Sequence, residues 1–486
     1  MSRRYIALPT GPSGTVAGQI RVRCPGCGET TSSADLSSRA MVCPWCDFHF
    51  PVEATSHLRL LVDEGSFRPL AKQAGGPGLF GWATLFGQPL ALALGDPLTC
   101  WTTADASILI SLAEEARLEH CPLLWVVTAP RGTVAEPLWV GVLAALDQLG
   151  EASLPWIALL SGPCWGAVAA VALQADLVLA EPGAVVAPVL PAVLRGAGRL
   201  PLESRRSPRD LLRAGWADAV LPRGAQRGDL ATLLALLGLE GKSYRWASPS
   251  GQGNGVDVSH PLKAIPGLLD PFFELHGDRR SEDDPALVGG LARLRHSGAR
   301  LLVLATGEEQ GRLVPRRRGE AIAAGGWRKA TRLLRLAARF GLPVVTLAGR
   351  VGLRVRRRDR SGETAADLGD CLSTLLSLSV PTVSVHLGSG GGMAGLALSA
   401  TDHVLSAEEV AEDLRQEGIL LDGTFARGEE LPAMVAEHLQ RLSQTYAVHG
   451  PLGRRKLLQR RYARWTRLLL GEGTASSVGQ DAGKAT

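Results

Sequence analysis

The chain has 486 residues, of which 45% are apolar and 20% charged, and its net charge is +5. This length allows about two or three domains with sizeable cores. The net charge is small for the length and does not by itself indicate nucleic-acid binding. The N-terminus lacks a secretory signal, and Gly162, Pro163 and Gly166 interrupt the uncharged stretch 156–174. We therefore expect no membrane span and a cytoplasmic protein.

After a loose tail over residues 1–20, the first predicted unit is a small metal-binding module over residues 21–51. Four of the eight cysteines follow the spacing C-x2-C-x15-C-x2-C, namely Cys24, Cys27, Cys43 and Cys46. Two such pairs bring four thiolates to one ion, which is typical of a tetrahedral zinc site. Four thiolates leave no open coordination position, so we expect one structural zinc. The scattered cysteines are expected to be buried thiols in a reducing compartment.

Apolar runs alternate with helical patterns over residues 52–246 and again over residues 260–470. The runs include LLWVVTA and WIALL in the first half, and LLVLAT and VVTLA in the second. This alternation predicts α/β domains with mostly parallel sheets covered by helices. The segment 247–259 is rich in Gly and Ser without periodicity and predicts a linker, and residues 471–486 are expected to be disordered.

A near-repeat relates the two halves. Residues 155–180 read PWIALLSGPCWGAVAAVALQADLVLA, and residues 381–406 read PTVSVHLGSGGGMAGLALSATDHVLS. In each copy a proline opens an apolar strand, a Gly-rich turn follows, and a small-residue helix leads to an Asp and another strand. The repeat predicts two copies of one fold that face each other with a shared site between them.

The two Gly-rich turns are the candidate catalytic elements. Glycines at the start of a helix expose backbone N–H groups, which stabilise a developing oxyanion. A single turn of this kind is as often a matter of tight packing, but two copies in register favour a function. The amides would come from Trp165, Gly166 and Ala167 in the first turn, and from Gly390, Gly391 and Gly392 in the second.

Other signals for chemistry are few. Arginines cluster at 316–318 and 350–360, where they fit the phosphates of a nucleotide-bearing cofactor or a nucleic acid, and equally a solvated surface. The sequence contains no Walker loop, no G-x-S-x-G elbow, no H-E-x-x-H motif and no evident acid/base pair of carboxylates. We therefore expect chemistry that depends on backbone amides and bound cofactors.

Several segments resemble the carboxyltransferase of bacterial acetyl-CoA carboxylase, with its β and α subunits fused. The cysteine segment followed by RLLVDEGSF resembles the zinc ribbon of the β subunit, and AEPGAVV and SPRDLLRAGWADAVLPR resemble the end of its crotonase-like domain. FFELHGDRRSEDDPALVGGLARL, GGWRKATRLLRLAARFGLPVVT and GSGGGMAGLAL resemble the α subunit. The resemblance covers most of residues 21–465. It implies two tandem crotonase-like (ClpP/crotonase) ββα domains behind a zinc ribbon.

The family implies a reaction that suits the missing acid/base pair. Carboxybiotin on a carrier protein supplies CO2, the biotin anion takes a proton from acetyl-CoA, and the enolate attacks CO2 to give malonyl-CoA for fatty acid biosynthesis. By position, Gly166 and Ala167 would hold the thioester enolate oxygen. Gly390 and Gly391 would hold the ureido oxygen of biotin. The residues expected to bind CoA or carboxybiotin are Arg131, Gly132, Arg350 and Gly352.

The resemblance also implies partners. The sequence contains no visible biotin-attachment or biotin carboxylase segment, so a biotin carboxyl carrier protein and a biotin carboxylase would act with this chain. The family assembles from two β and two α subunits, which implies a homodimer of the fused chain.

Departures from the family pattern leave two alternatives open. AGRVGLRVRRR (348–358) replaces a glycine-rich family loop, and Met393 and Ala394 stand where the family has glycines. A family segment of about twenty residues is missing after Ser406, which exceeds ordinary loop variation. One alternative is a malonyl-thioester decarboxylase on the same scaffold. The other is a non-catalytic carboxylase paralogue with a scaffold or nucleic-acid-binding role.

Overall fold

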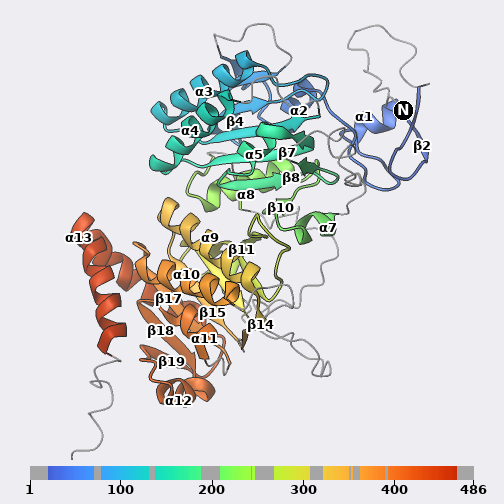
Figure 1. Ribbon diagram of the computed structural model, residues 1–486. Coiled ribbons are helices and arrows are strands. Elements are labelled where there is room, and N and C mark those ends of the chain that lie inside the picture. Colours follow the sequence, from blue (N-terminus) through green and yellow to red (C-terminus); the bar gives the residue numbers. More distant parts are fainter. Residues whose placement is uncertain are drawn as a thin grey trace, which may run out of the picture.

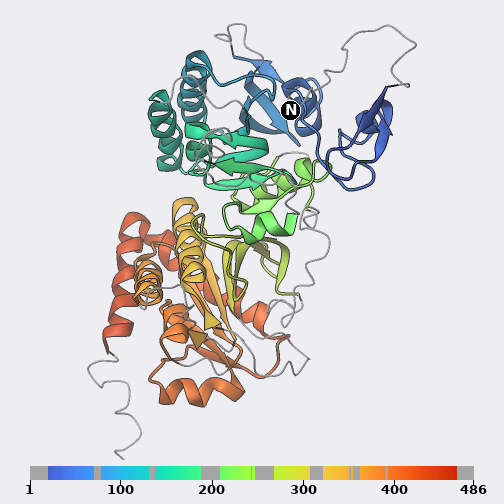
Figure 2. The same ribbon diagram turned by 45° about the vertical axis from the view of Figure 1, so that its right-hand side comes forward.

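The computed structural model describes residues 20–70, 78–130, 137–187, 208–241, 244–246, 267–306, 321–349, 352–353, 362–388 and 392–467. These residues form a small N-terminal module and two α/β domains, which lie one above the other (Figures 1 and 2). Of the predicted tails and linker, only Ile20 is described. The domain limits drawn from the sequence therefore stay predictions.

The N-terminal module, which we call the ribbon (residues 21–51), lies beside the first domain (Figure 1). An antiparallel pair, β1 (Arg21–Arg23) and β2 (Thr30–Ser32), precedes the short helix α1 (Ser33–Ser38). The helix begins here because the Ser32 hydroxyl accepts a hydrogen bond from the Asp35 N–H at 3.0 Å. A bridge between Val42 and His49 then closes the second cysteine knuckle.

The first domain is built on one sheet, parallel from β5 to β10 and antiparallel from β3 to β5. In sheet order its strands are β10 (Ala219–Val220), β8 (Leu177–Ala180), β7 (Trp156–Trp165), β6 (Leu123–Ala129), β5 (Gln88–Leu94), β4 (Leu79–Leu85) and β3 (Arg68–Pro69), and β9 (Val185–Ala187) pairs with the end of β7. Its helices are α2 (Ala54–Leu61), α3 (Thr103–Leu118), α4 (Leu138–Glu151), α5 (Gly166–Ala172), α7 (Pro208–Arg213) and α8 (Gln226–Leu236).

The second domain repeats this layout strand for strand. In sheet order its strands are β19 (Gly423–Phe425), β18 (His403–Ala407), β17 (Thr382–His386), β15 (Val344–Ala348), β13 (Arg300–Thr306), β12 (Leu287–Leu294) and β11 (Leu269–Glu274), with β14 (Ala321–Ile322) and β16 (Gly352–Leu353) paired apart from them. Its helices are α9 (Ala324–Phe340), α10 (Glu363–Ser377), α11 (Gly392–Ser399), α12 (Glu408–Gln416) and α13 (Leu431–Arg467). The prediction of two α/β domains with mostly parallel sheets is confirmed.

Local sequence explains why these elements form. The central strand β6, LLWVVTA, is buried along its whole length, as expected for a parallel strand covered on both faces. Helix α3 begins with a capping box in which the side chains of Thr102 and Asp105 each accept the other's backbone N–H. Helix α9 ends at Gly341, whose φ of 65° is in the left-handed region that favours glycine.

Aspartates join neighbouring parallel strands at their amino ends, at matching positions in the two domains; Asp176, Asp218 and Asp402 are buried, and Asp422 is exposed. The N–H of Trp156 donates to Asp176 at 3.0 Å, and that of Thr382 donates to Asp402 at 2.9 Å. One strand further along, Asp218 accepts the Val178 N–H in the first domain, and Asp422 accepts the Val404 N–H in the second. The near-repeat seen in the sequence is therefore a structural repeat.

Arginines neutralise these aspartates, but they come from different places in the two domains. In the second domain they come from its own helix α13, where Arg461 pairs with Asp402 at 2.7 Å and Arg464 with Asp422 at 2.8 Å. In the first domain they come across the interdomain contact. We call this second group the Asp–Arg clamp; it consists of Asp176, Asp218, Arg279, Arg332 and Arg339.

The clamp fixes how the two domains meet. Arg332 lies 2.6 Å from Asp218 and Arg339 lies 3.2 Å from Asp176, so α9 contacts the amino ends of β8 and β10. The first Gly-rich turn lies at the opposite end, after β7. In Figure 1, α9 and α10 separate α5 from α11. The interdomain contact does not bring the two turns together, so the expectation that the two copies face each other across a shared site is wrong for a single chain.

A continuous apolar core supports the same contact. One cluster of buried side chains includes Leu230 and Leu234 of α8, Leu291 of β12 and Leu333 of α9. Every residue of α8 is buried except the half-buried Arg227 and the exposed Gly228, because the helix packs between the first sheet and β12. Among the described residues, no helix is both long enough and apolar enough to cross a membrane.

The clamp predicts a large cost for removing Arg332. Burial opposes the ionisation of Asp218, yet Arg332 and Arg279 hold the pKa of this carboxyl below its usual value. Arg332→Met leaves Asp218 short of one cation, and we expect a loss of about 3 kcal/mol in the free energy of unfolding. Chemical denaturation measures this loss. The control Arg441→Met removes an exposed ion pair to Glu437 and should cost less than about 1 kcal/mol. Equal losses in the two variants would contradict the role of the clamp.

Candidate functional site

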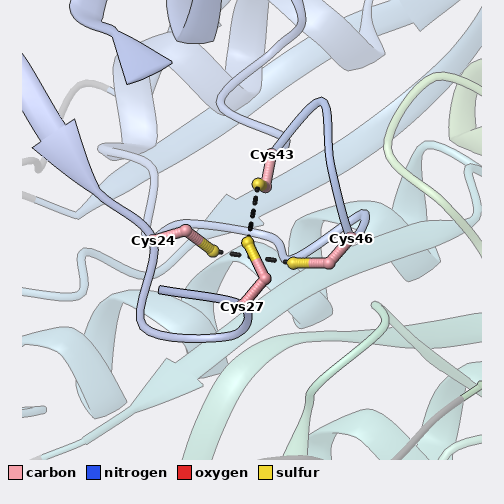
Figure 3. A group of neighbouring side chains, drawn as sticks. All are labelled: Cys24, Cys27, Cys43 and Cys46. Atoms are coloured by element: carbon pink, nitrogen blue, oxygen red, sulfur yellow. Dashed lines mark hydrogen bonds between the residues drawn. The ribbon is translucent and has the colours of Figure 1, made fainter. Parts of the chain in front are cut away.

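The four motif cysteines converge at one end of the ribbon (Figure 3). Their Sγ atoms all lie within 4.8 Å of one another. The separation is 3.6 Å between Cys24 and Cys46 and 3.9 Å between Cys27 and Cys43. Zinc–sulfur bonds of about 2.3 Å in a tetrahedron place the sulfurs roughly 3.8 Å apart. The cluster therefore has the donor set and the spacing of a four-thiolate metal site, as the sequence predicts.

The first turn connects β7 to α5. Gly166 begins α5 with a φ of +71°, a conformation that favours glycine. The preceding residue, Trp165, provides no side-chain cap for the helix. Strand β9 pairs with Pro163, Cys164 and Trp165 and so forms the second wall of the turn. Gly166 and Ala167 are half-buried, which leaves the amino end of α5 open to a ligand.

The second turn is described only in part. Gly392 is the first residue of α11, whereas Gly390 and Gly391 lie outside the described residues. Next along the helix, Met393 is 49% exposed and Ala394 is buried. The strand–turn–helix order of the first copy is kept, but the position of the second set of amides stays a prediction.

Of the residues expected to bind CoA or carboxybiotin, only Gly352 is described. It lies in β16, which pairs with β14 and contacts α11, so the structure places it beside the helix of the second turn. Arg131, Gly132 and Arg350 lie outside the described residues, as does most of the arginine-rich segment 350–360.

A buried histidine beneath the second turn was not singled out from the sequence. His386 ends β17, and its Nε2 lies 2.7 Å from the Ser399 hydroxyl, which in turn donates to the Gly395 carbonyl. Its Nδ1 has no partner among the described residues. The first copy has Leu160 and Leu173 at these positions. A histidine at the position where the first copy has a leucine is the signal that would have identified it.

The segment 276–284, HGDRRSEDD, has a structural role. The Arg279 guanidinium donates to the carbonyls of Leu173 and Asp176, at 3.0 and 3.1 Å, just after α5. Gly277 (φ +69°) packs so closely that a Cβ there would lie 2.0 Å from the Gly215 carbonyl oxygen. This motif therefore holds the domains together.

Asp283, in the same segment, is held by two cationic side chains. Asp283 lies 2.8 Å from the buried Lys329 and 3.1 Å from His276. Burial opposes its ionisation, but Lys329 and His276 hold the pKa of Asp283 far below its usual value. A carboxylate fixed in this way is a poor general base near neutral pH, so Asp283 is not a candidate for that role.

Comparison with known proteins identifies the family. The family model for acetyl co-enzyme A carboxylase carboxyltransferase-like proteins matches residues 258–411. The chain is 35% identical over 470 residues to the acetyl-coenzyme A carboxylase carboxyl transferase subunits beta/alpha of Salinispora tropica, covering 82% of this chain and 81% of that protein. The chain belongs to this family. The protein of the same name from Saccharopolyspora erythraea is 30% identical over 454 residues, covering 81% of this chain and 78% of that one.

Solved structures of carboxyltransferases share the fold. Transcarboxylase 12S matches with a TM-score of 0.63 at 16% identity, covering 81% of this chain and 90% of that chain. A single-chain, multi-domain long-chain acyl-CoA carboxylase matches with a TM-score of 0.59 at 21% identity, covering 86% of this chain and 47% of that one. The resemblance to fused acetyl-CoA carboxylase carboxyltransferases and the prediction of two crotonase-like domains are confirmed.

In this family member, His386 predicts a distinct dependence of stability on pH. Desolvation lowers the pKa of His386 to about 4, whereas an unfolded histidine titrates near about 6.5. Between these values the unfolded state binds more protons than the folded state. The free energy of unfolding is therefore highest above about pH 6.5 and decreases as the pH drops below it. At about pH 5 the loss attributable to His386 is about 2 kcal/mol.

The variant His386→Leu, which places the first-copy residue at this position, should lack this loss. Chemical denaturation at about pH 7.5 and about pH 5 measures the difference. Ser384→Ala, on the same strand and likewise buried, should behave like the wild type. An unchanged pH dependence in His386→Leu would show that the histidine is not held neutral by burial.

Proposed function

We propose that this protein is the carboxyltransferase component of an acetyl-CoA carboxylase or a related acyl-CoA carboxylase. It would move CO2 from carboxybiotin on a carrier protein to acetyl-CoA and so form malonyl-CoA. The observation that carries the proposal is that a chain of the fused β/α family contains two equivalent strand–turn–helix units, β7–α5 and β17–α11.

The first turn is the proposed site for the thioester. During transfer of the methyl proton to the biotin nitrogen, negative charge develops on the thioester oxygen, and the enolate carbon then forms the new bond to CO2. The amides of Gly166 and Ala167 would stabilise that oxygen, because they lie in the first turn of α5, where the N-cap residue provides no side-chain hydrogen bond. No described carboxylate is needed as a base.

The second turn is the proposed site for carboxybiotin. The amides of Gly390, Gly391 and Gly392 would hold its ureido oxygen while CO2 leaves. We propose that Arg350 and Gly352 line the same site, since β16 contacts α11. On the first domain, Arg131 and Gly132 follow the carboxyl end of β6, the strand beside β7, and are proposed to contact CoA.

We propose that the cysteine cluster holds one structural zinc ion. The four sulfurs have the spacing of a closed tetrahedral site. The measurement is metal analysis of purified protein, with about one zinc expected per chain. Cys43→Ser should lose the metal, whereas substitution of the scattered Cys371 by Ser should retain it. A metal-free wild type that keeps its ribbon folded would contradict this assignment.

A second copy of the chain is proposed to complete each active site. Within one chain the clamp docks the second domain on the amino ends of β8 and β10, so the first turn is left without a partner turn. A homodimer would supply one. A biotin carboxyl carrier protein and a biotin carboxylase are the proposed further partners, and a reducing, cytoplasmic location suits the free thiols.

Met393 keeps the decarboxylase alternative open. This side chain is half-exposed at the start of α11, at a position where the family has a glycine, and we propose that its bulk disfavours biotin at the second turn. A site that binds malonyl-CoA but not biotin would lose CO2 without carboxylating a carrier. Dependence on biotin therefore separates the two functions, and a complete lack of turnover would favour a non-catalytic paralogue.

The test is turnover of malonyl-CoA with and without biocytin. The reverse reaction should require biocytin, and Gly166→Val should lower kcat by about 10²–10³-fold, because the turn can no longer aim its amides at the thioester oxygen. Gly341→Val is the control, since Gly341 has a similar φ of +65° at the far end of α9, and it should keep the wild-type kcat. Biocytin-independent turnover would contradict a carboxyltransferase.

A further inference from the structure

Glu181 is a buried carboxylate between the ribbon and the first turn. It directly follows β8, and its side chain is 2% exposed. The Arg223 guanidinium donates to both carboxylate oxygens, at 2.8 and 2.5 Å. Burial alone would raise the pKa of Glu181, but Arg223, His49 and His57 hold it well below its usual value. Glu181 is therefore ionised, and its charge is fully paired.

Arg223 and His49 connect this carboxylate to the ribbon. Arg223 also donates to the carbonyls of Ala40 and Phe50, at 2.9 and 3.0 Å. His49 Nδ1 lies 3.5 Å from Glu181. The carbonyl of Ala40 belongs to a backbone segment with φ near +55°, uncommon for residues with side chains, that leads directly to the metal-site residue Cys43. The arginine therefore contacts the loop that carries the cysteine knuckle.

Glu181 also connects the two strands that flank the first turn, β7 and β9. Its N–H donates to the Leu160 carbonyl at 2.8 Å, and the Ser161 hydroxyl donates to its carboxylate at 3.4 Å. Ser161 lies in β7, shortly before the turn at Gly166. After Glu181 the chain continues into β9, which pairs with Trp165. A shift of Glu181 would therefore move the residues on both sides of Gly166.

Two further side chains complete this group, which we call the Glu181 hub. His57 of α2 lies 3.2 Å from Glu181 and 3.5 Å from Ser161, and the Gln226 amide of α8 donates to Glu181 at 2.8 Å. The members of the hub are His49, His57, Ser161, Glu181, Arg223 and Gln226, and all six are buried. One carboxylate thus joins the ribbon, α2, β7, β8 and α8.

We propose that the Glu181 hub couples metal binding in the ribbon to acyl-CoA binding at the first turn. A four-thiolate module of this size depends on its metal for folding. Metal loss would withdraw His49 and the carbonyl acceptors of Arg223, admit water to the Glu181 pair and release the walls of the turn. The hub residues are positioning residues, since none of them is in the turn itself. The inference rests on the proposed function, which places the acyl-CoA thioester at Gly166.

Linkage gives the coupling a readout other than activity. If the metal tightens acyl-CoA binding by some factor, then acyl-CoA must tighten metal binding by the same factor. Malonyl-CoA should therefore protect the ribbon metal from a chelator. Couplings of this kind are typically about 5–150-fold, so at least a fivefold shift in the chelator concentration for half-release is expected at saturating malonyl-CoA.

The experiment compares variants that break the hub with a matched control. Arg223→Met removes the contact with both Glu181 and the ribbon. The double variant Glu181→Gln/Arg223→Met does the same without leaving an unpaired buried charge. Arg227→Met is the control, because Arg227 also pairs with a carboxylate, Asp63 at 2.6 Å, and lies over the Phe86 ring, both of them outside the ribbon. Metal release to a chromogenic chelator and malonyl-CoA binding by calorimetry are measured for each.

In the wild type and in Arg227→Met, malonyl-CoA should protect the metal. In both hub variants this protection should disappear, and malonyl-CoA should bind more weakly by the factor that the wild type shows in protection. Equal protection in the hub variants, or malonyl-CoA binding to the wild type without protection, would overturn the inference and leave the proposed function standing. Failure of malonyl-CoA to bind the metal-loaded wild type would overturn both.

Discussion

Buried aspartates at the amino ends of parallel strands are the constraint on which both domains depend. Asp176 and Asp402 accept the first N–H of the neighbouring strand, and each also pairs with an arginine. A buried carboxylate is tolerated only when cations and hydrogen bonds compensate for its lost hydration. The position of the arginines therefore decides what can pack against each sheet. The arginines that pair with the aspartates of the first domain belong to the second domain.

This arrangement gives the two edges of each sheet separate roles. Arginines cover the amino edges. Arg332 and Arg339 pair with the aspartates of the first sheet, and Arg461 and Arg464 pair with those of the second. The carboxyl edges carry the Gly-rich turns. Ligands of open α/β sheets commonly bind at the carboxyl ends of the strands. The interdomain and α13 ion pairs and the proposed sites of chemistry thus lie at opposite ends of the same strands, and the ribbon contacts the carboxyl end of the first sheet through Glu181.

Local patterns were sufficient for the parts of the structure that depend on local chemistry. The CxxC spacing predicted the cysteine cluster, and the near-repeat predicted equivalent elements, including Asp176 and Asp402. Contacts between distant residues were not predictable. Nothing near Asp176 in the sequence indicates that Arg339 neutralises it, or that Arg223 joins Glu181 to Phe50, because such pairs are set by how domains pack. For the same reason the sequence suggested facing copies where the structure has a clamp.

The central claim is that acyl-CoA binds at the carboxyl edge of the first sheet, away from the interdomain clamp. Hydrogen exchange with and without malonyl-CoA, followed by mass spectrometry, tests it most directly. The account predicts slower exchange in residues 159–171, which run from the end of β7 through the first turn into α5, and in residues 181–187, which lead into β9. It predicts unchanged exchange in the clamp segment 276–284, which contains Arg279. Slower exchange in the clamp segment, with the first turn unaffected, would contradict it.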